Sequence, residues 1–180
     1  MAKTAEGDEY AFETLVRRHQ TSVLNLIYRY VGDRTMARDL AQEVFIRVWR
    51  AAKSFKPKAK FTTWVYRIAA NFCLNELKSS SRKKLFFSES LVEEGRPPNE
   101  ESNVSSSAED MLLAEERTRR ISEALHSLPE DQRMALILKR YDNLSYHEIA
   151  NIMECSVSAV ESLLVRAKRN LQEKLIFSEK

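Results

Sequence analysis

The amino-acid sequence predicts an all-α protein built of two small helical domains that a flexible acidic linker joins. Glycine and proline are scarce, with three and four among 180 residues, so long helices are expected. Apolar residues recur at helical spacing almost throughout, and no strand-like alternation is sustained. Residues 85–110 interrupt this spacing with serine, glutamate and a Pro97-Pro98 pair. We therefore expect domains at 1–84 and 111–180, the second containing a helix-turn-helix.

The first domain opens with a predicted amphipathic helix over about 9–31. His19 falls on its apolar stripe, and a packing role is favoured because no other His or Cys lies at metal-ligand spacing. Gly32 is expected to end the helix, since glycine adopts the left-handed conformation that closes helices. Asp33 or Thr35 can accept the first free backbone N–H groups of the next helix.

A second helix is predicted over about 35–53, with one clean apolar stripe and one polar face. Trp49 lies on the polar face, among charged residues. An exposed tryptophan in such surroundings suits a contact with another protein. The pattern fits equally well a Trp49 that packs against another helix of its own domain.

Residues 47–84 form a strongly basic block with 11 basic and 1 acidic side chains, which predicts a site for a polyanion. A third helix, over about 62–79, falls within it. Aromatic, amide and basic groups share one face of this helix, next to Phe61 and a lysine-rich connector. Single-stranded nucleic acid is bound by such a combination, because cations hold the backbone and rings stack on bases. The face carries Trp64, Arg67, Asn71, Asn75 and Lys78, and Arg82 extends the same line.

The segment 85–110 carries 1 basic and 7 acidic side chains and no helical stripe. Its composition is that of a linker without regular structure. It could be a plain solubilising tether, or a mimic of nucleic acid that lies in a cationic channel of a partner. The sequence by itself favours the tether.

The second domain contains a predicted helix over about 108–126, then one that begins near Pro129, and then the helix-turn-helix. Ser145 and Glu148 match the S-x-x-E capping box, which marks a helix start. The chain must turn near Glu154 or Cys155, one of which takes the positive φ that glycine often supplies. The last helix has one apolar and one polar stripe, as in a helix-turn-helix, although an ordinary helical hairpin would look similar.

Several classes of protein are disfavoured. The three isolated glycines cannot build a phosphate-binding loop, and no catalytic or metal-binding motif is present, so we expect neither an enzyme nor a cofactor or metal. Cys73 and Cys155 are expected to be buried free thiols of a reducing compartment. The charged first residues and the lack of a long apolar run predict a cytoplasmic protein without membrane insertion.

Three segments taken in order resemble the bacterial sigma factors, specifically the short extracytoplasmic-function group. DLAQEVFIRVW (39–49) is similar to the segment that binds the clamp helices of core RNA polymerase. FTTWVYRIAANFCLNELKSSSRK (61–83) resembles the segment that melts and binds the minus-ten promoter element. Residues 128–171 resemble the domain that binds the minus-thirty-five element. The resemblance covers nearly the whole chain.

The resemblance implies a non-catalytic factor that binds core RNA polymerase and directs it to promoters, with an anti-sigma factor as a further partner. It assigns polymerase docking to Asp39, Gln42, Glu43, Phe45 and Trp49. It assigns the single-stranded minus-ten element to Lys60, Phe61, Trp64, Tyr66, Arg67, Asn71, Asn75, Lys78 and Arg82. It assigns duplex DNA at the minus-thirty-five element to Ser156, Ser158, Ala159, Glu161, Ser162, Arg166 and Arg169.

The recognition helix departs from the family pattern, because many relatives carry basic residues where Glu161 and Leu163 stand. Glu161 could accept a hydrogen bond from cytosine N4, or it could pair within the protein and contact no base.

Two other functions stay open: a stand-alone helix-turn-helix regulator would leave residues 47–84 unexplained, and an RNA-binding protein would leave the C-terminal domain unexplained. In the sigma family the linker threads through the polymerase toward the RNA exit path.

Overall fold

The structure is a computed structural model of the chain, and the residues that it describes are all-helical or in turns. It describes residues 1–55, 60–84, 116 and 119–177, and only the backbone of 77–84 and 176–177. The predicted linker, 85–110, lies outside the described residues. The helices are α1 (Ala2–Ala5), α2 (Glu9–Val31), α3 (Arg34–Ala51), η1 (Ala52–Ser54), α4 (Phe61–Lys84), α6 (Glu130–Arg140), α7 (Tyr146–Met153) and α8 (Val157–Phe177), and residues 119–126 are helical too.

Local signals in the sequence set the helix ends of the N-terminal module, residues 1–84. The Asp8 carboxylate accepts a 2.9 Å hydrogen bond from the backbone N–H of Ala11 and so caps the start of α2. Gly32 ends α2 with φ +81°, as predicted, and Asp33 rather than Thr35 caps α3 through the Met36 N–H. The helices α2 and α3 then pack along their apolar stripes, with α4 against both.

The C-terminal module, residues 116–177, follows the same local logic. Pro129 immediately precedes α6, a position where its missing N–H costs the helix no hydrogen bond. The predicted capping box is present, since the Ser145 hydroxyl accepts from the Glu148 N–H and the Glu148 carboxylate accepts from the Ser145 N–H. Glu154 takes the left-handed turn position at φ +53° and separates α7 from α8. The helix-turn-helix prediction is thereby confirmed in its geometry.

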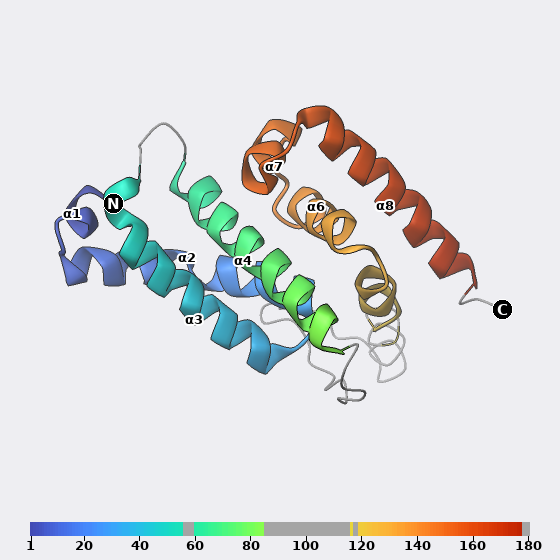
Figure 1. The fold of residues 1–180 in the computed structure, drawn as a ribbon, viewed down its shortest axis with the longest axis horizontal. Coiled ribbons are helices and arrows are strands. Elements are labelled where there is room, and N and C mark those ends of the chain that lie inside the picture. The colour runs from blue at the N-terminus through green and yellow to red at the C-terminus, as the bar shows by residue number, and fades with distance from the viewer. Residues whose placement is uncertain (56–59, 85–115, 117–118, 178–180) are drawn as a thin grey trace, which may run out of the picture.

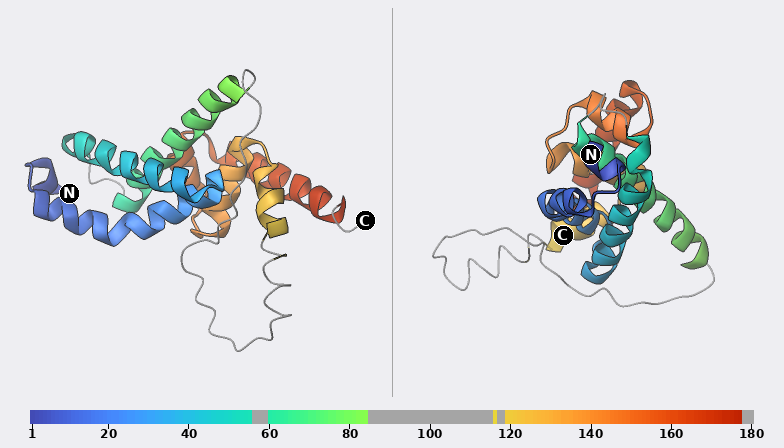
Figure 2. Two further views of the ribbon diagram at one scale, coloured as in Figure 1. Left: turned by 90° about the horizontal axis from the view of Figure 1, so that it is seen from below. Right: turned by 90° about the vertical axis from the view of Figure 1, so that its left-hand side faces the viewer.

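The two modules lie against each other, with α4 between them. In Figure 1, α4 (green) has α3 on one side and α6 and α7 (orange) on the other, α2 passes behind it, and α8 (red) lies outermost. In the left view of Figure 2, α1 (dark blue) and α8 (red) lie toward opposite ends of the molecule. Buried apolar side chains of both modules form one continuous cluster, so the modules share a hydrophobic core. None of the described helices combines the length and apolar character that a membrane span requires.

The seam between the modules includes an arginine and a close backbone approach. Arg133, only 8% exposed, donates a 3.1 Å hydrogen bond from Nη1 to the Tyr30 carbonyl, and its guanidinium lies 4.8 Å from the centre of the Tyr30 ring. The His126 ring abuts Gly32 so closely that a Cβ at Gly32 would lie 2.7 Å from His126 Nε2. Gly32 therefore serves both the end of α2 and the fit of the two modules.

Candidate partner and nucleic-acid interfaces

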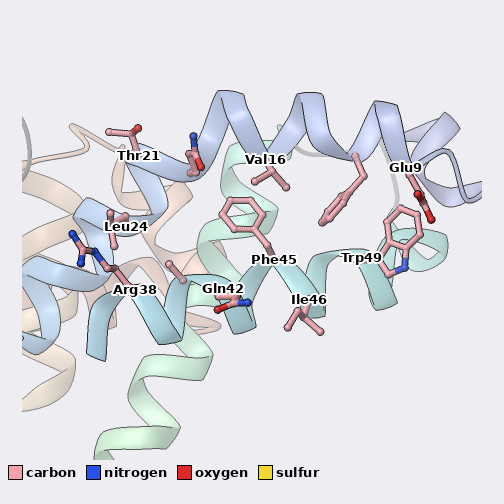
Figure 3. A pocket seen from close by; sticks show the side chains of 12 residues that line it. Glu9, Val16, Thr21, Leu24, Arg38, Gln42, Phe45, Ile46 and Trp49 are labelled. Atoms are coloured by element: carbon pink, nitrogen blue, oxygen red, sulfur yellow. The ribbon is translucent and has the colours of Figure 1, made fainter. Parts of the chain in front are cut away.

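An apolar groove of about 770 Å³ runs between α2 and α3 (Figure 3). Phe45 on α3 points across the groove toward Val16 on α2. Trp49 lines the same groove, and its ring lies 4.9 Å from that of Phe12 at an angle of 55°. The groove residues are Glu9, Phe12, Val16, Gln20, Thr21, Leu24, Arg38, Ala41, Gln42, Phe45, Ile46 and Trp49. An open apolar groove with a charged rim is the shape that receives an apolar surface of another protein.

Three of the five residues predicted for polymerase docking line this groove, namely Gln42, Phe45 and Trp49. Phe45 is buried, whereas Trp49 is half-buried. Asp39 is exposed and does not line the groove. Glu43 forms a 2.9 Å ion pair with Arg47. The packing interpretation of Trp49 is confirmed, since its ring packs against Phe12 within the module, and a contact of Trp49 with another protein stays a prediction.

The tryptophan of α4 lies differently from its predicted place. Helical spacing predicts Trp64 on the open face of α4, but the residue is only 9% exposed. Phe55, from the segment before α4, meets it edge-on at 5.2 Å, and Phe61 lies at 6.0 Å. His19 packs on Phe61 at 4.9 Å, which gives it the packing role that the sequence predicts. Burying the rings in this aromatic cluster removes a large apolar area from water. Because the neighbouring rings cover Trp64, it cannot stack on a base in this conformation.

The remaining minus-ten candidates vary in exposure. Lys60, Arg67 and Asn75 are exposed, and Phe61 and Asn71 are half-buried. Lys78 and Arg82 lie on α4, where the structure describes only their backbone. The exposed cations have partners in the C-terminal module: Lys60 Nζ lies 3.4 Å from Glu148, and Arg67 Nε lies 4.0 Å from Glu154.

Tyr66, another minus-ten candidate, is 7% exposed and lies at the seam between the modules. Its hydroxyl donates a 2.9 Å hydrogen bond to Asp142 Oδ1, 76 positions away in sequence. Burial raises the pKa of Tyr66, and the adjacent Asp142 carboxylate raises it further. Burial also raises the pKa of Asp142, while the hydrogen bond from Tyr66 and the charge of Arg29 act in the opposite direction. In this conformation the Tyr66 hydroxyl is therefore engaged within the protein.

The predicted minus-thirty-five residues lie on the outward side of α8. Ser156 precedes α8, and its hydroxyl accepts a 3.1 Å hydrogen bond from the Ala159 N–H. Ala159 is half-buried, and the other six candidates are exposed. The Ser162 hydroxyl donates to the Ser158 carbonyl at 2.9 Å, and Arg166 Nε donates to the Ser162 carbonyl at 3.2 Å. Val165, which the prediction omits, is 69% exposed on the same helix and adds an apolar contact to this face.

Glu161 is exposed on α8, and no ion pair between described residues involves its carboxylate. Arg169, a candidate cation further along the helix, instead lies 3.9 Å from Glu173. Of the two interpretations of Glu161, the one in which it pairs with a nearby cation finds no support in the described residues. The interpretation in which it faces a base stays a prediction.

Two groups of residues at these interfaces escape prediction from the sequence. The residues of α2 that line the groove form an apolar stripe in the sequence. That stripe does not reveal that Phe12 and Val16 stay accessible in the folded protein. The carboxylates that meet α4, from Asp142, Glu148 and Glu154, have no local signal at all, because their partners lie 76 to 88 positions away.

Cys73 is buried and free as predicted, and burial raises its pKa to about 12, while Cys155 is free but half-buried.

The chain matches two family descriptions that together span most of its length. Residues 15–83 match Sigma-70 region 2, and residues 118–171 match Sigma-70 region 4. An ECF RNA polymerase sigma-E factor of Escherichia coli K12 is 38% identical over 177 residues, which cover 96% of this chain and 91% of the relative. The factor of the same name from Haemophilus influenzae is 34% identical, and the match covers 96% of this chain and 92% of that relative.

Two solved structures share the fold. The sigma factor RpoE of Bartonella quintana, in complex with the anti-sigma factor NepR, matches with a TM-score of 0.71 at 22% identity, over 92% of this chain and 96% of that one. CnrH in complex with the cytosolic domain of CnrY matches with a TM-score of 0.68 at 23% identity, over 99% of this chain and 96% of that one.

Proposed function

The chain belongs to the extracytoplasmic-function group of the sigma-70 family, and we propose that its two modules divide the work of promoter binding. It is an alternative sigma factor that directs RNA polymerase to promoters and so initiates transcription. The observation that carries this conclusion is the match of both modules, in order, to regions 2 and 4 of that family together with a relative 38% identical over 96% of the chain.

The N-terminal module is proposed to hold both the polymerase and the opened strand. The groove between α2 and α3 accepts an apolar surface of core RNA polymerase, and Phe45 and Trp49 supply its apolar lining. Lys60, just before α4, and Arg67 and Asn71 on α4 contact the single strand of the minus-ten element, with the basic residues that follow. Cations on such a surface bind the phosphates and the amide groups contact base edges.

The C-terminal module is proposed to bind duplex DNA at the minus-thirty-five element. Helix α8 presents an exposed polar face of the kind that enters a major groove. Arg166 can donate two hydrogen bonds to a guanine, and Ala159 or Val165 can contact a thymine methyl group. The acidic segment 85–110 connects this module to the first and is proposed to lie in a cationic path of the polymerase.

The role is proposed to be non-catalytic, and the proposed place of action is the bacterial cytoplasm, where polymerase and promoters are found. We expect no cofactor. An anti-sigma factor is a proposed partner, because both solved structures of this fold described above are complexes with an anti-sigma factor or with a cytosolic domain. Such a partner would compete for the groove or for α4, since these are the surfaces that the polymerase and the promoter need.

Reconstituted transcription tests the proposal. The purified chain is mixed with bacterial core RNA polymerase and a library of genomic fragments, and the transcripts are sequenced. We expect start sites that share two spaced upstream elements and that appear only when the chain is present. A chain that selects duplex fragments but neither binds core polymerase nor starts transcripts would instead be a stand-alone regulator.

A further inference from the structure

Glu161 is an exposed carboxylate near the start of α8, on the side of the helix that is proposed to face duplex DNA. The side of α8 that carries Val160 and Leu164 is buried in the C-terminal module, and the helix lies outermost in Figure 1. In a helix-turn-helix, residues near the start of the second helix reach the base edges of the major groove. Glu161 therefore lies where side chains contact bases.

No protein group neutralises Glu161 within the described part of the chain. Its carboxylate takes part in no hydrogen bond or ion pair there. Residues 157–158 and 164–165, its neighbours on the helix surface, carry no positive charge. Arg166, the nearest basic residue in sequence, instead donates a 3.2 Å hydrogen bond from Nε to the Ser162 carbonyl. The charge of Glu161 is thus left open to whatever binds this face.

Elsewhere on its helices the chain often pairs an exposed glutamate with an arginine four positions away. Such pairs are Glu13–Arg17, Glu43–Arg47, Glu116–Arg120, Arg119–Glu123 and Arg169–Glu173. Glu161 lacks this partner on a surface that must approach the phosphates of DNA. Phosphates repel a carboxylate, so Glu161 weakens DNA binding unless a base donates a hydrogen bond to it.

The major groove offers such a carboxylate one favourable base. Cytosine presents the N4 amino group as a donor and no acceptor of its own. Guanine presents the acceptors N7 and O6, thymine presents the acceptor O4, and adenine places the acceptor N7 beside its N6 donor. An ionised carboxylate only accepts hydrogen bonds, so cytosine is the base that attracts it without also repelling it.

The other exposed side chains of this face cannot make the same selection. The hydroxyls of Ser158 and Ser162 both donate and accept, so they discriminate weakly between bases. Val165, which is 69% exposed, offers only apolar contact. Arg166 offers only donors and suits guanine. Among the described side chains of this face, Glu161 is thus the one that only accepts hydrogen bonds.

We propose that Glu161 is a specificity-determining residue: it selects a cytosine in the minus-thirty-five element by accepting a hydrogen bond from N4. The inference rests on the function proposed for α8. Selection works largely by rejection, because the unpaired carboxylate lowers the affinity for every element that offers it no donor. Glu161 and Arg166 then select different bases at different positions of the same element.

A promoter library tests the proposal with the holoenzyme formed from the full chain and core RNA polymerase. A promoter found by reconstituted transcription is randomised across its minus-thirty-five element, and the bound fragments are sequenced. We expect the wild type to favour cytosine over each other base by at least about tenfold at one position. Glu161→Gln should change the preference at that position to adenine, because glutamine can accept from N6 and donate to N7. Glu161→Ala should abolish the preference there and leave the other positions unchanged.

Two further variants serve as controls. Glu123→Ala makes the same change in net charge at an exposed glutamate of the same module, paired with Arg119, and should leave the selected element unchanged. Arg166→Ala should change the selection at a position other than that of the cytosine, which shows independently that α8 lies on the element. Thermal unfolding of Glu161→Ala should match that of the wild type, since the carboxylate has no partner among the described residues to lose.

The possible contrary results are distinct. The proposal is overturned if the wild type selects no cytosine, or if both Glu161 variants still select it. It is also overturned if Glu161→Ala raises the affinity equally for all elements, because the carboxylate then only repels phosphates. Any of these results together with an altered selection by Arg166→Ala would leave the function proposed for α8 intact. An element that none of the Glu161 and Arg166 variants alters would overturn both the inference and that function.

Discussion

The hydroxyl of Tyr66 on α4 donates a 2.9 Å hydrogen bond to Asp142 Oδ1 in the turn after α6, and this bond joins the two modules. The second carboxylate oxygen, Oδ2, is buried and has no hydrogen-bond partner among the described residues. The pKa of Asp142 is raised by burial, and the hydrogen bond from Tyr66 counters that effect. The tyrosine therefore stabilises a charge that the seam otherwise leaves poorly solvated.

Replacing Tyr66 by phenylalanine should lower the free energy of unfolding by about 1–3 kcal/mol, because a buried acceptor then lacks its donor. Urea denaturation followed by circular dichroism measures the change. Tyr10→Phe provides the control, since Tyr10 is 80% exposed and its loss of a hydroxyl should have no measurable effect. In an Asp142→Ala background, Tyr66→Phe should cost much less; an undiminished effect there would show that the hydroxyl acts through some other contact.

Replacing Gly32 by alanine should destabilise the protein for two reasons that can be separated. The backbone has φ +81°, which costs about 1–2 kcal/mol for a residue with a Cβ, and the added Cβ would meet His126 Nε2 at 2.7 Å. Gly7→Ala isolates the first reason, because Gly7 has φ +93° and no atom within 4 Å of its would-be Cβ. Thermal unfolding should show a larger loss for Gly32→Ala, and equal losses would mean that the contact with His126 is unimportant.

Local chemistry made most helix ends predictable from the sequence. Gly32, Asp33 and the Ser145–Glu148 capping box each act through backbone groups within four positions, so their pattern carries the information. The left-handed turn residue of the helix-turn-helix was predictable to within two positions and proved to be Glu154. These confirmed helix ends thus depend on interactions between neighbours in sequence.

Tertiary contacts account for what the sequence could not reveal. Helical spacing assigns Trp64 to an open face, but Phe55, from the segment before α4, and Phe61, at the first position of α4, cover its ring. The pairing of Lys60 with Glu148 joins residues 88 positions apart, and no periodicity encodes it. Burial of a residue on the polar stripe of one helix depends on a second element whose approach only the folded structure specifies.

Placing a charge in the groove between α2 and α3 should weaken polymerase binding without harming the fold. Ile46 lines the groove and is 37% exposed, so Ile46→Glu adds a carboxylate to an apolar docking surface at little cost to stability. We expect core polymerase affinity to fall at least about tenfold, roughly the cost of burying part of an unpaired charge at an interface. Ile121→Glu, at a residue 47% exposed in the other module, is the control. Equal affinities of the two variants, measured by fluorescence titration, would exclude the groove as the docking site.

Replacing Arg166 on α8 by alanine should weaken the binding of duplex DNA selectively. Arg166 is exposed on α8 and makes a single described hydrogen bond, to the Ser162 carbonyl, so its loss should leave thermal stability within about 0.5 kcal/mol of the wild type. Affinity of the holoenzyme for a promoter fragment should fall by about 1–3 kcal/mol. Arg119→Ala, at an exposed arginine paired with Glu123, should leave affinity unchanged. A loss shared by both variants would indicate general electrostatics rather than contact with a base.

Protonation of His126 should weaken the seam as the pH falls. Its Nδ1 lies 2.7 Å from the Ser122 carbonyl, an acceptor, so Nδ1 carries the hydrogen and the buried Nε2 facing Gly32 is bare. Burial lowers the pKa of His126 and the charge of Arg133 lowers it further, against the hydrogen bond to Ser122.

In the unfolded chain His126 has its ordinary pKa near 6.5, whereas in the folded protein its pKa is lower, so the unfolded chain binds this proton more readily. The free energy of unfolding therefore decreases as the pH falls through 6.5 toward the lower folded pKa. His126→Gln should lose less stability than the wild type between about pH 7.5 and 5.5. His19 has a pKa lowered in the same direction, by burial and then by Arg18, so a smaller loss persists in that variant and shrinks again in H19Q/H126Q. Urea unfolding at both pH values measures this, and identical losses in wild type and His126→Gln would show that the seam does not sense this proton.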